Sequence, residues 1–183
     1  IDYYMLSENK KNAKIAIESG LAQYPSNVLF KVCHARYLIM LGENTKAKKV
    51  LKQIEKENSN DADVLLALAE FYSYEKKHSD AAKYFELALK LIDEEDKFSI
   101  IENLIDEYES IGQHKKMIPH LKKMIQLEFN SVEAMNQLSF CYTILGKEDE
   151  GIEYFSGLIE TSPFNVLAWF NLGNLFYSLE LFE

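Results

Sequence analysis

Apolar residues along this chain recur at spacings of three, four and seven, as in Leu65, Leu68, Ala69 and Tyr72. Such spacings place side chains on one face of an α-helix, whereas a half-buried strand needs strict alternation. The helical pattern continues through the sequence without a competing alternating segment. The pattern therefore predicts an all-α protein in which each helix buries one apolar face.

The same pattern returns at an interval of about 34 residues, which is typical of stacked helix pairs. One complete copy contains Met135, Leu138, Tyr142, Gly146, Gly151, Phe155, Leu158 and Pro163. One period earlier the corresponding positions hold Ile101, Leu104, Tyr108, Gly112, Met117, Leu121, Met124 and Phe129. The clearest copy contains Trp169, Leu172, Gly173 and Phe176, and we assign Trp169 to the core.

The register divides residues 1–183 into repeats of a single solenoid. We expect complete repeats at 28–61, 62–97, 98–131 and 132–165, with partial repeats at 1–27 and 166–183. The partial repeat at the start keeps the register at Tyr4, Ala13, Ile17 and Pro25. Because the chain begins and stops inside a repeat, we interpret it as a fragment of a longer array.

Two sets of positions agree with this register. Asn27, Asp61, Ser131 and Asn165 each precede a helical pattern, where a short side-chain oxygen can cap free backbone N–H groups. Small residues recur where two helices approach closely, at Ala35, Ala69 and Gly173 and again at Ala47, Ala81 and Gly151. Local chemistry and periodicity therefore predict the same helix boundaries.

These residues resemble the tetratricopeptide repeat (TPR) family across essentially the whole chain. The resemblance implies a right-handed superhelical solenoid of antiparallel helix pairs, with first helices lining a concave groove and second helices forming much of the convex face. It also implies a non-catalytic scaffold whose groove binds a peptide or helix of a partner protein, since solenoids present long concave surfaces.

Charge is distributed unevenly between the two kinds of helix. The net charge is −9, which argues against nucleic acid because phosphate binding uses clustered Lys and Arg. The expected first helices at 62–75, 98–111, 132–145 and 166–179 contain no Lys or Arg. If they line the groove as the resemblance implies, the groove is acidic to neutral and suits a basic or neutral protein segment.

Helical spacing assigns the groove lining to residues left over from the packing face: Asp63, Leu66, Ala67, Glu70, Glu102, Asn103, Asp106, Glu109, Glu133, Asn136, Gln137, Phe140, Leu167, Phe170, Asn171 and Asn174. Their amides can pair with an extended peptide backbone, and the aromatic rings, with Tyr177, can supply apolar contact. Two alternatives stay open at this point. The polar residues can form an ordinary solvated face, and Phe170 can pack between repeats.

One TPR subtype makes a specific contrast. Relatives that bind chaperone tails clamp a terminal carboxylate with groove Lys, Arg and Asn side chains. Apart from Arg36, the groove lining of this chain has no cation. The sequence therefore predicts no binding to the acidic C-terminal tails of heat-shock chaperones.

The sequence offers no catalytic or metal-binding motif, and we expect no enzyme activity and no cofactor. His78 and His114 share one repeat position, in the turn between helices, where packing or capping is expected. His34 and Cys33 are adjacent on a helix and point apart. Cys33 and Cys141 are expected to be reduced packing residues. The acidic turn at 93–96 is expected to be solvated.

Two further features bear on the setting of the protein. No apolar run approaches the roughly 18 residues of a membrane span, and the compartment stays open with a slight preference for the cytoplasm. The apolar helix ending at 179–183 supports an alternative function as a self-assembling module that forms a homodimer through terminal helices. A second alternative is a regulatory arm of a larger protein.

Overall fold

The computed structural model describes residues 10–127 and 131–182, with side chains as far as Glu180. The predictions for Tyr4, for Phe129 and for the side chains of residues 181–183 lie outside the described residues. The chain forms two compact units, Ile1–Ile100 and Ile101–Glu183, which are described separately.

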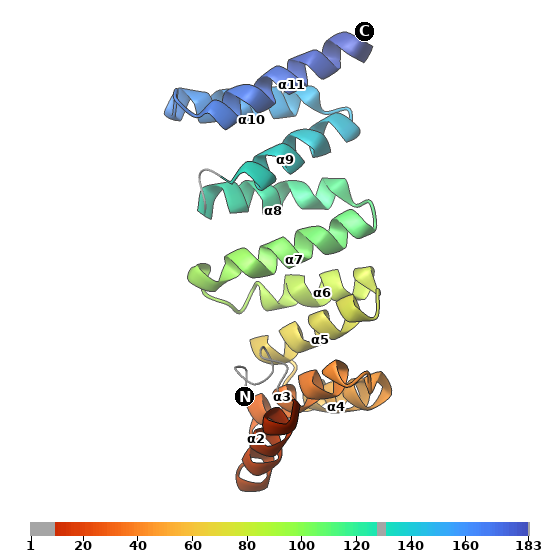
Figure 1. Cartoon of the computed structure of the whole chain (residues 1–183). Helices are drawn as coiled ribbons and strands as arrows, with labels where there is room; N and C mark the ends of the chain where they lie inside the picture. Colours follow the sequence, from red (N-terminus) through yellow and green to blue (C-terminus); the bar gives the residue numbers. More distant parts are fainter. Residues whose placement is uncertain (1–9, 128–130, 183) are drawn as a thin grey trace. The chain divides into compact units, whose positions relative to one another are not determined.

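Unit 1 consists of successive helices joined by short turns (Figure 1). They are α2 (Lys10–Gln23), α3 (Val28–Met40), α4 (Asn44–Glu57), α5 (Ala62–Tyr74), α6 (His78–Ala88) and the 3-10 helix η1 (Glu94–Asp96). Helix α3 packs against α4, and α5 packs against α6. The first helices α3 and α5 also contact each other, so they form one layer of the unit.

Unit 2 repeats this arrangement (Figure 1). Its helices are α7 (Lys97–Ser110), whose first turn belongs to unit 1, α8 (His114–Leu127), α9 (Val132–Ile144), α10 (Glu148–Thr161) and α11 (Val166–Phe182). Helix α9 contacts α8, α10 and α11. Over the described ranges all regular structure is helical, which confirms the predicted all-α fold of helix pairs.

One predicted boundary needs correction. Helix α7 begins at Lys97, so this first helix carries a basic residue that the expected range 98–111 excluded. The Lys97 ammonium lies 2.9 Å from the Glu94 carboxylate of η1, in the longer connection after α6. This ion pair links the acidic turn to the first residue of α7. By contrast, α5, α9 and α11 contain neither Lys nor Arg.

The predicted N-caps are confirmed at all four positions. The side chains of Asn27, Asp61, Ser131 and Asn165 accept hydrogen bonds from the backbone N–H three residues ahead, at 3.2, 3.2, 3.3 and 3.0 Å. Each bond satisfies one of the N–H groups that a helix start leaves free. Helices α3, α5, α9 and α11 therefore begin where local chemistry predicts.

The turn from first to second helix uses a left-handed residue. Gly42, Gly112 and Gly146 have φ of +74°, +65° and +61°, and Lys76 occupies the equivalent place with φ of +55°. Glycine adopts this conformation without the Cβ clash that other residues meet. The Lys76 backbone is therefore strained, at a turn position where Gly42, Gly112 and Gly146 adopt the same conformation without strain.

Small residues allow close helix packing at some predicted positions only. Ala35, Ala47, Ala69 and Ala81 are completely buried. A Cβ atom on Gly151 would lie 2.8 Å from Leu175 Cδ1, so α10 and α11 approach closely there as predicted. The prediction is wrong for Gly173, where an added Cβ would meet nothing within 4 Å.

Trp169 is also misassigned by the periodicity. Its side chain is 54% exposed, and its indole Nε1 donates a hydrogen bond to the Pro163 carbonyl at 2.9 Å. Helix α11 buries Ala168, Leu172 and Leu175 instead. In the described part of the chain, α11 packs mainly on α9 and α10, and the Trp169 side chain stays about half exposed.

Candidate partner-binding surface

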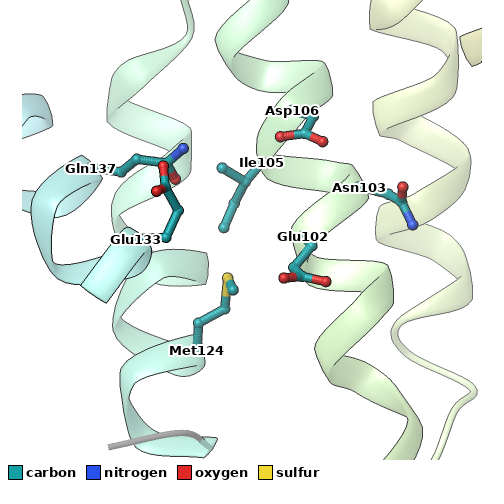
Figure 2. Close-up of a pocket in the computed structure, with 7 residues that line it drawn as sticks. All are labelled: Glu102, Asn103, Ile105, Asp106, Met124, Glu133 and Gln137. Atoms are coloured by element: carbon teal, nitrogen blue, oxygen red, sulfur yellow. The ribbon is translucent and has the colours of Figure 1, made fainter. Parts of the chain in front are cut away.

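A cavity of about 290 Å³ lies between α7, α8 and α9 in unit 2 (Figure 2). We call it the acidic cavity, and it is lined by Glu102, Asn103, Ile105, Asp106, Met124, Glu133 and Gln137. The periodicity had predicted five of these seven as surface lining and had placed Met124 on the packing face. Ile105 was missed, because a nearly buried apolar residue lines a cavity only where the neighbouring helices leave space beside it.

The acidic cavity has an apolar floor and a charged rim. Ile105 and Met124 are only 2% and 4% exposed. Figure 2 shows Glu133 and Gln137 on one side of them and Glu102 and Asp106 on the other. Asn103 points away from Glu133 in this view. An apolar stem can therefore rest on the floor while a polar group reaches the rim.

The rim concentrates negative charge. Burial raises the pKa of the Asp106 carboxyl above its usual value, and repulsion from Glu109, Glu107 and Glu133 raises it further. Among the residues that the structure describes, no cation forms an ion pair with Glu102, Asp106 or Glu133. The rim therefore carries a negative potential that an approaching cation would relieve.

The predicted amide donors differ in accessibility, and one needs correction. Asn136 and Asn174 are exposed and Gln137 is half-buried, but Asn171 is completely buried. The Asn171 Nδ2 group donates to Asn136 Oδ1 at 3.1 Å and to the Leu167 carbonyl at 3.0 Å. Asn171 therefore positions the Asn136 side chain and offers no surface of its own, because α9 and α11 pack together over it.

Exposed aromatic rings lie on α9 and α11. Phe140 is 50% exposed, and its ring meets the His114 ring edge-on with centroids 5.8 Å apart. Phe170 and Tyr177 are 58% and 64% exposed, so the alternative that Phe170 packs between repeats is wrong for the described residues. All three rings remain open to solvent and to a partner.

The predicted lining residues of unit 1 are electrostatically different. Asp63 and Glu70 are both exposed on α5. The prediction is wrong for Ala67, which is completely buried in the same helix. The Arg36 guanidinium holds Glu70 through Nε to Oε2 at 2.8 Å and Nη2 to Oε1 at 2.9 Å. With Ile39, Met40 and Tyr74, this pair lines a second cavity of about 440 Å³. The cation that the sequence places in the lining is therefore already engaged by a carboxylate.

The histidine and cysteine residues considered as catalytic candidates lie in helices. His78 and His114 are the first residues of α6 and α8, one step beyond the turn in which they were predicted. Among the described residues, neither Cys33 nor Cys141 forms a disulfide, and burial raises the pKa of Cys141 to about 11, so this thiol stays protonated. Over residues 10–127 and 131–182, no group of three or more His, Cys, Asp and Glu side chains is placed to hold a metal ion.

Among the described helices, none combines the length and apolar character that crossing a membrane requires.

The helix pairs match a known repeat family. Residues 62–94 and 132–165 each match the model of the tetratricopeptide repeat. Both segments are therefore tetratricopeptide repeats. The matched segments lie within the predicted repeats 62–97 and 132–165, and the division of the chain into repeat units stays a prediction.

Solved structures with the same fold include TPR proteins. The structure of YrrB, described as a TPR protein with an unusual peptide-binding site, has a TM-score of 0.65 and 21% identity, covering 90% of this chain and 84% of YrrB. MamA has a TM-score of 0.63 and 21% identity, covering 87% of this chain and 92% of MamA.

A third match comes from the structure of Naa15/Naa10 bound to HypK-THB, with a TM-score of 0.78 and 16% identity over 87% of this chain and 24% of the matched chain. A comparison with curated protein sequences found no match. The structural similarities show the TPR fold, which is typically a non-catalytic protein-interaction fold.

Proposed function

We propose that this TPR protein is a non-catalytic scaffold that holds a basic or neutral segment of a partner protein on the first-helix surface of unit 2. The observation that carries the proposal is the acidic cavity, in which three carboxylates without a described counter-ion surround an apolar floor. Helix spacing places Glu133, Asn136, Gln137 and Phe140 on one side of α9, next to that cavity.

The carboxylates, amides and aromatic rings of this surface contribute to binding in different ways. The carboxylates attract a cationic partner and select against an acidic one, since charge complementarity governs encounter and specificity more than affinity. The amides of Asn136 and Gln137 can hydrogen-bond an extended backbone, and Asn171 holds Asn136 in place. The exposed rings of Phe140 and Phe170 supply apolar contact area, which provides most of the affinity.

Charge reversal at the rim tests the proposal. The intact protein is used for affinity capture from its source lysate, beside a Glu102→Lys, Asp106→Lys variant, and bound proteins are identified by mass spectrometry. A Glu153→Lys, Glu160→Lys variant makes the same charge change at two exposed positions of α10. We expect a partner that is lost from the α7 variant and retained by the α10 variant.

Equal capture by both variants would move the partner site away from the acidic cavity. Circular dichroism of each variant is the folding control, because both substitutions replace exposed side chains.

The exposed face of α11 supports a second candidate function, self-assembly. Trp169, Phe170, Phe176 and Tyr177 are each at least half exposed. Monomeric proteins rarely leave a large continuous apolar patch uncovered. Light scattering over a range of protein concentrations tests this candidate: a rising mass that a Phe176→Asp variant abolishes supports pairing through α11, and a constant monomer mass rejects it.

A further inference from the structure

We propose that the acidic cavity accepts a single basic side chain, a lysine or arginine, from the partner segment. This inference rests on the proposed function, because it names the group by which the same surface recognises its partner. The argument uses the size of the cavity, its floor and the arrangement of its charges.

Size limits what the acidic cavity can hold. Its volume is about 290 Å³, whereas pockets for drug-sized ligands span roughly 300–1,000 Å³. A partner helix is about 10 Å wide and cannot enter such a space. One long side chain from a segment lying across α7 and α9 can enter it.

The floor selects a side chain with an apolar stem. Ile105 and Met124 contribute a nearly dry surface at the base. Lysine and arginine bury their methylene stems on such surfaces while the charged head stays at the polar edge. The flexible thioether of Met124 can adapt to either stem. A short polar side chain would leave this floor uncovered.

The rim selects a positive head group. Glu102 and Asp106 project from α7, one helical turn apart, and Glu133 projects from α9 on the opposite side (Figure 2). A cation between them reaches carboxylates from both helices, and the half-buried Gln137 amide adds a neutral acceptor. An acidic head would meet three like charges, and an apolar head would desolvate the carboxylates without compensation.

A cavity in unit 1 contains the kind of cation that we propose for the acidic cavity, and this comparison supports the assignment. There the Glu70 carboxylate is held by Arg36 of the same chain, next to Ile39 and Met40. That cavity shows a guanidinium lying against a carboxylate and apolar side chains within this protein. The acidic cavity presents the same kind of surface with the cation missing among the described residues.

The methyl groups of the floor residues Ile105 and Met124 give NMR signals that test the inference directly. The full chain is labelled with ¹³C at the methyl groups of Met and Ile and titrated with Nα-acetyl-lysine methylamide, the arginine analogue and the norleucine analogue. Norleucine keeps the apolar stem and removes the charge. Buried Met117 and Met135, at 1% and 0% exposure, are internal controls for indirect changes.

We expect saturable shifts of the Met124 and Ile105 methyl signals with the lysine and arginine probes and not with norleucine. Each of Glu102→Gln and Glu133→Gln should weaken the apparent affinity by up to about fivefold, the range of an exposed ion pair. Unchanged Met117 and Met135 signals in these variants show that the fold is kept. Equal shifts with norleucine, or no shift at Met124, would overturn the inference.

A second measurement separates this inference from the proposed function. Once capture has identified a partner segment, every Lys and Arg in that segment is replaced by Gln and its affinity is measured by calorimetry. A loss of at least about fivefold supports recognition of a basic side chain. Unchanged affinity overturns the inference and leaves the scaffold function standing, whereas failure of capture itself would count against the scaffold function.

Discussion

Arg36 of α3 donates two hydrogen bonds to Glu70 of α5, from Nε to Oε2 at 2.8 Å and from Nη2 to Oε1 at 2.9 Å. The two side chains are 28% and 46% exposed, so the pair lies at the surface and contributes no more than about 1 kcal/mol to stability. Its functional consequence is larger, because the guanidinium is already bound to a carboxylate of its own unit and a carboxylate ligand would have to compete with Glu70.

This pair leads to a prediction about acidic partners. Calorimetry should detect no binding of a peptide with the acidic C-terminal tail of a heat-shock chaperone, because Arg36 is occupied and the lining of unit 2 is negative. Glu70→Gln removes the negative charge that faces Arg36, and this variant is measured beside the unmodified protein. Measurable affinity of the unmodified protein for such a peptide would contradict the electrostatic argument.

The crowded charge at Asp106 predicts an opposite effect of one substitution on stability and on binding. The folded-state pKa of Asp106 is raised by burial and by neighbouring carboxylates, so its ionisation disfavours the folded state. Asp106→Asn should therefore raise the melting temperature at pH 7 while weakening binding of basic ligands. The stability gain should shrink as the pH falls below the raised pKa, where native Asp106 is protonated as well.

Thermal melts of both proteins between pH 3 and pH 7, the range spanning ordinary carboxyl titration, measure this effect. Glu160→Gln removes one charge from exposed α10 without the Asp106 surroundings and is the matched control. A gain in stability that is the same at both ends of the pH range would show that Asp106 ionisation is not its cause.

The left-handed residue after α5 offers a stabilising substitution. Lys76→Gly should increase the free energy of unfolding by about 0.5–1 kcal/mol, since it removes Cβ strain at φ of +55° at the cost of greater chain entropy. Gly146→Ala at the equivalent turn should lower it by about 1 kcal/mol. Urea denaturation measures both values, and changes of the same sign in the two variants would argue against conformational strain.

The two glycines of α10 make a matched pair for helix packing. Gly151→Ala would place a Cβ 2.8 Å from Leu175 and 2.9 Å from Tyr142, and this overpacking should cost about 1–3 kcal/mol. Gly157→Ala on the same helix meets nothing within 4 Å and should stabilise by about 0.5–1 kcal/mol, because alanine favours the helix. Denaturant titration measures the free energy of unfolding of both variants. An unchanged free energy of unfolding in Gly151→Ala would show that α10 and α11 can separate.

The sequence by itself determined where α3, α5, α9 and α11 begin and which face of most helices is apolar. Asn27, Asp61, Ser131 and Asn165 cap helices at the predicted places, because a cap involves a side chain and a backbone N–H only three residues apart. The packing stripe Leu65, Leu68, Ala69 and Tyr72 is buried as expected, since the helical period is a local property.

Tertiary structure decided which of these local features is covered and which is paired. Trp169 and Asn171 are two positions apart on α11, yet the tryptophan is exposed and the asparagine is buried. Residues distant in sequence form the Asn171–Asn136 hydrogen bond, the Arg36–Glu70 ion pair and the floor of the acidic cavity at Ile105 and Met124. A helical period sets the direction of a side chain, but the neighbouring helix decides whether that direction meets protein or solvent.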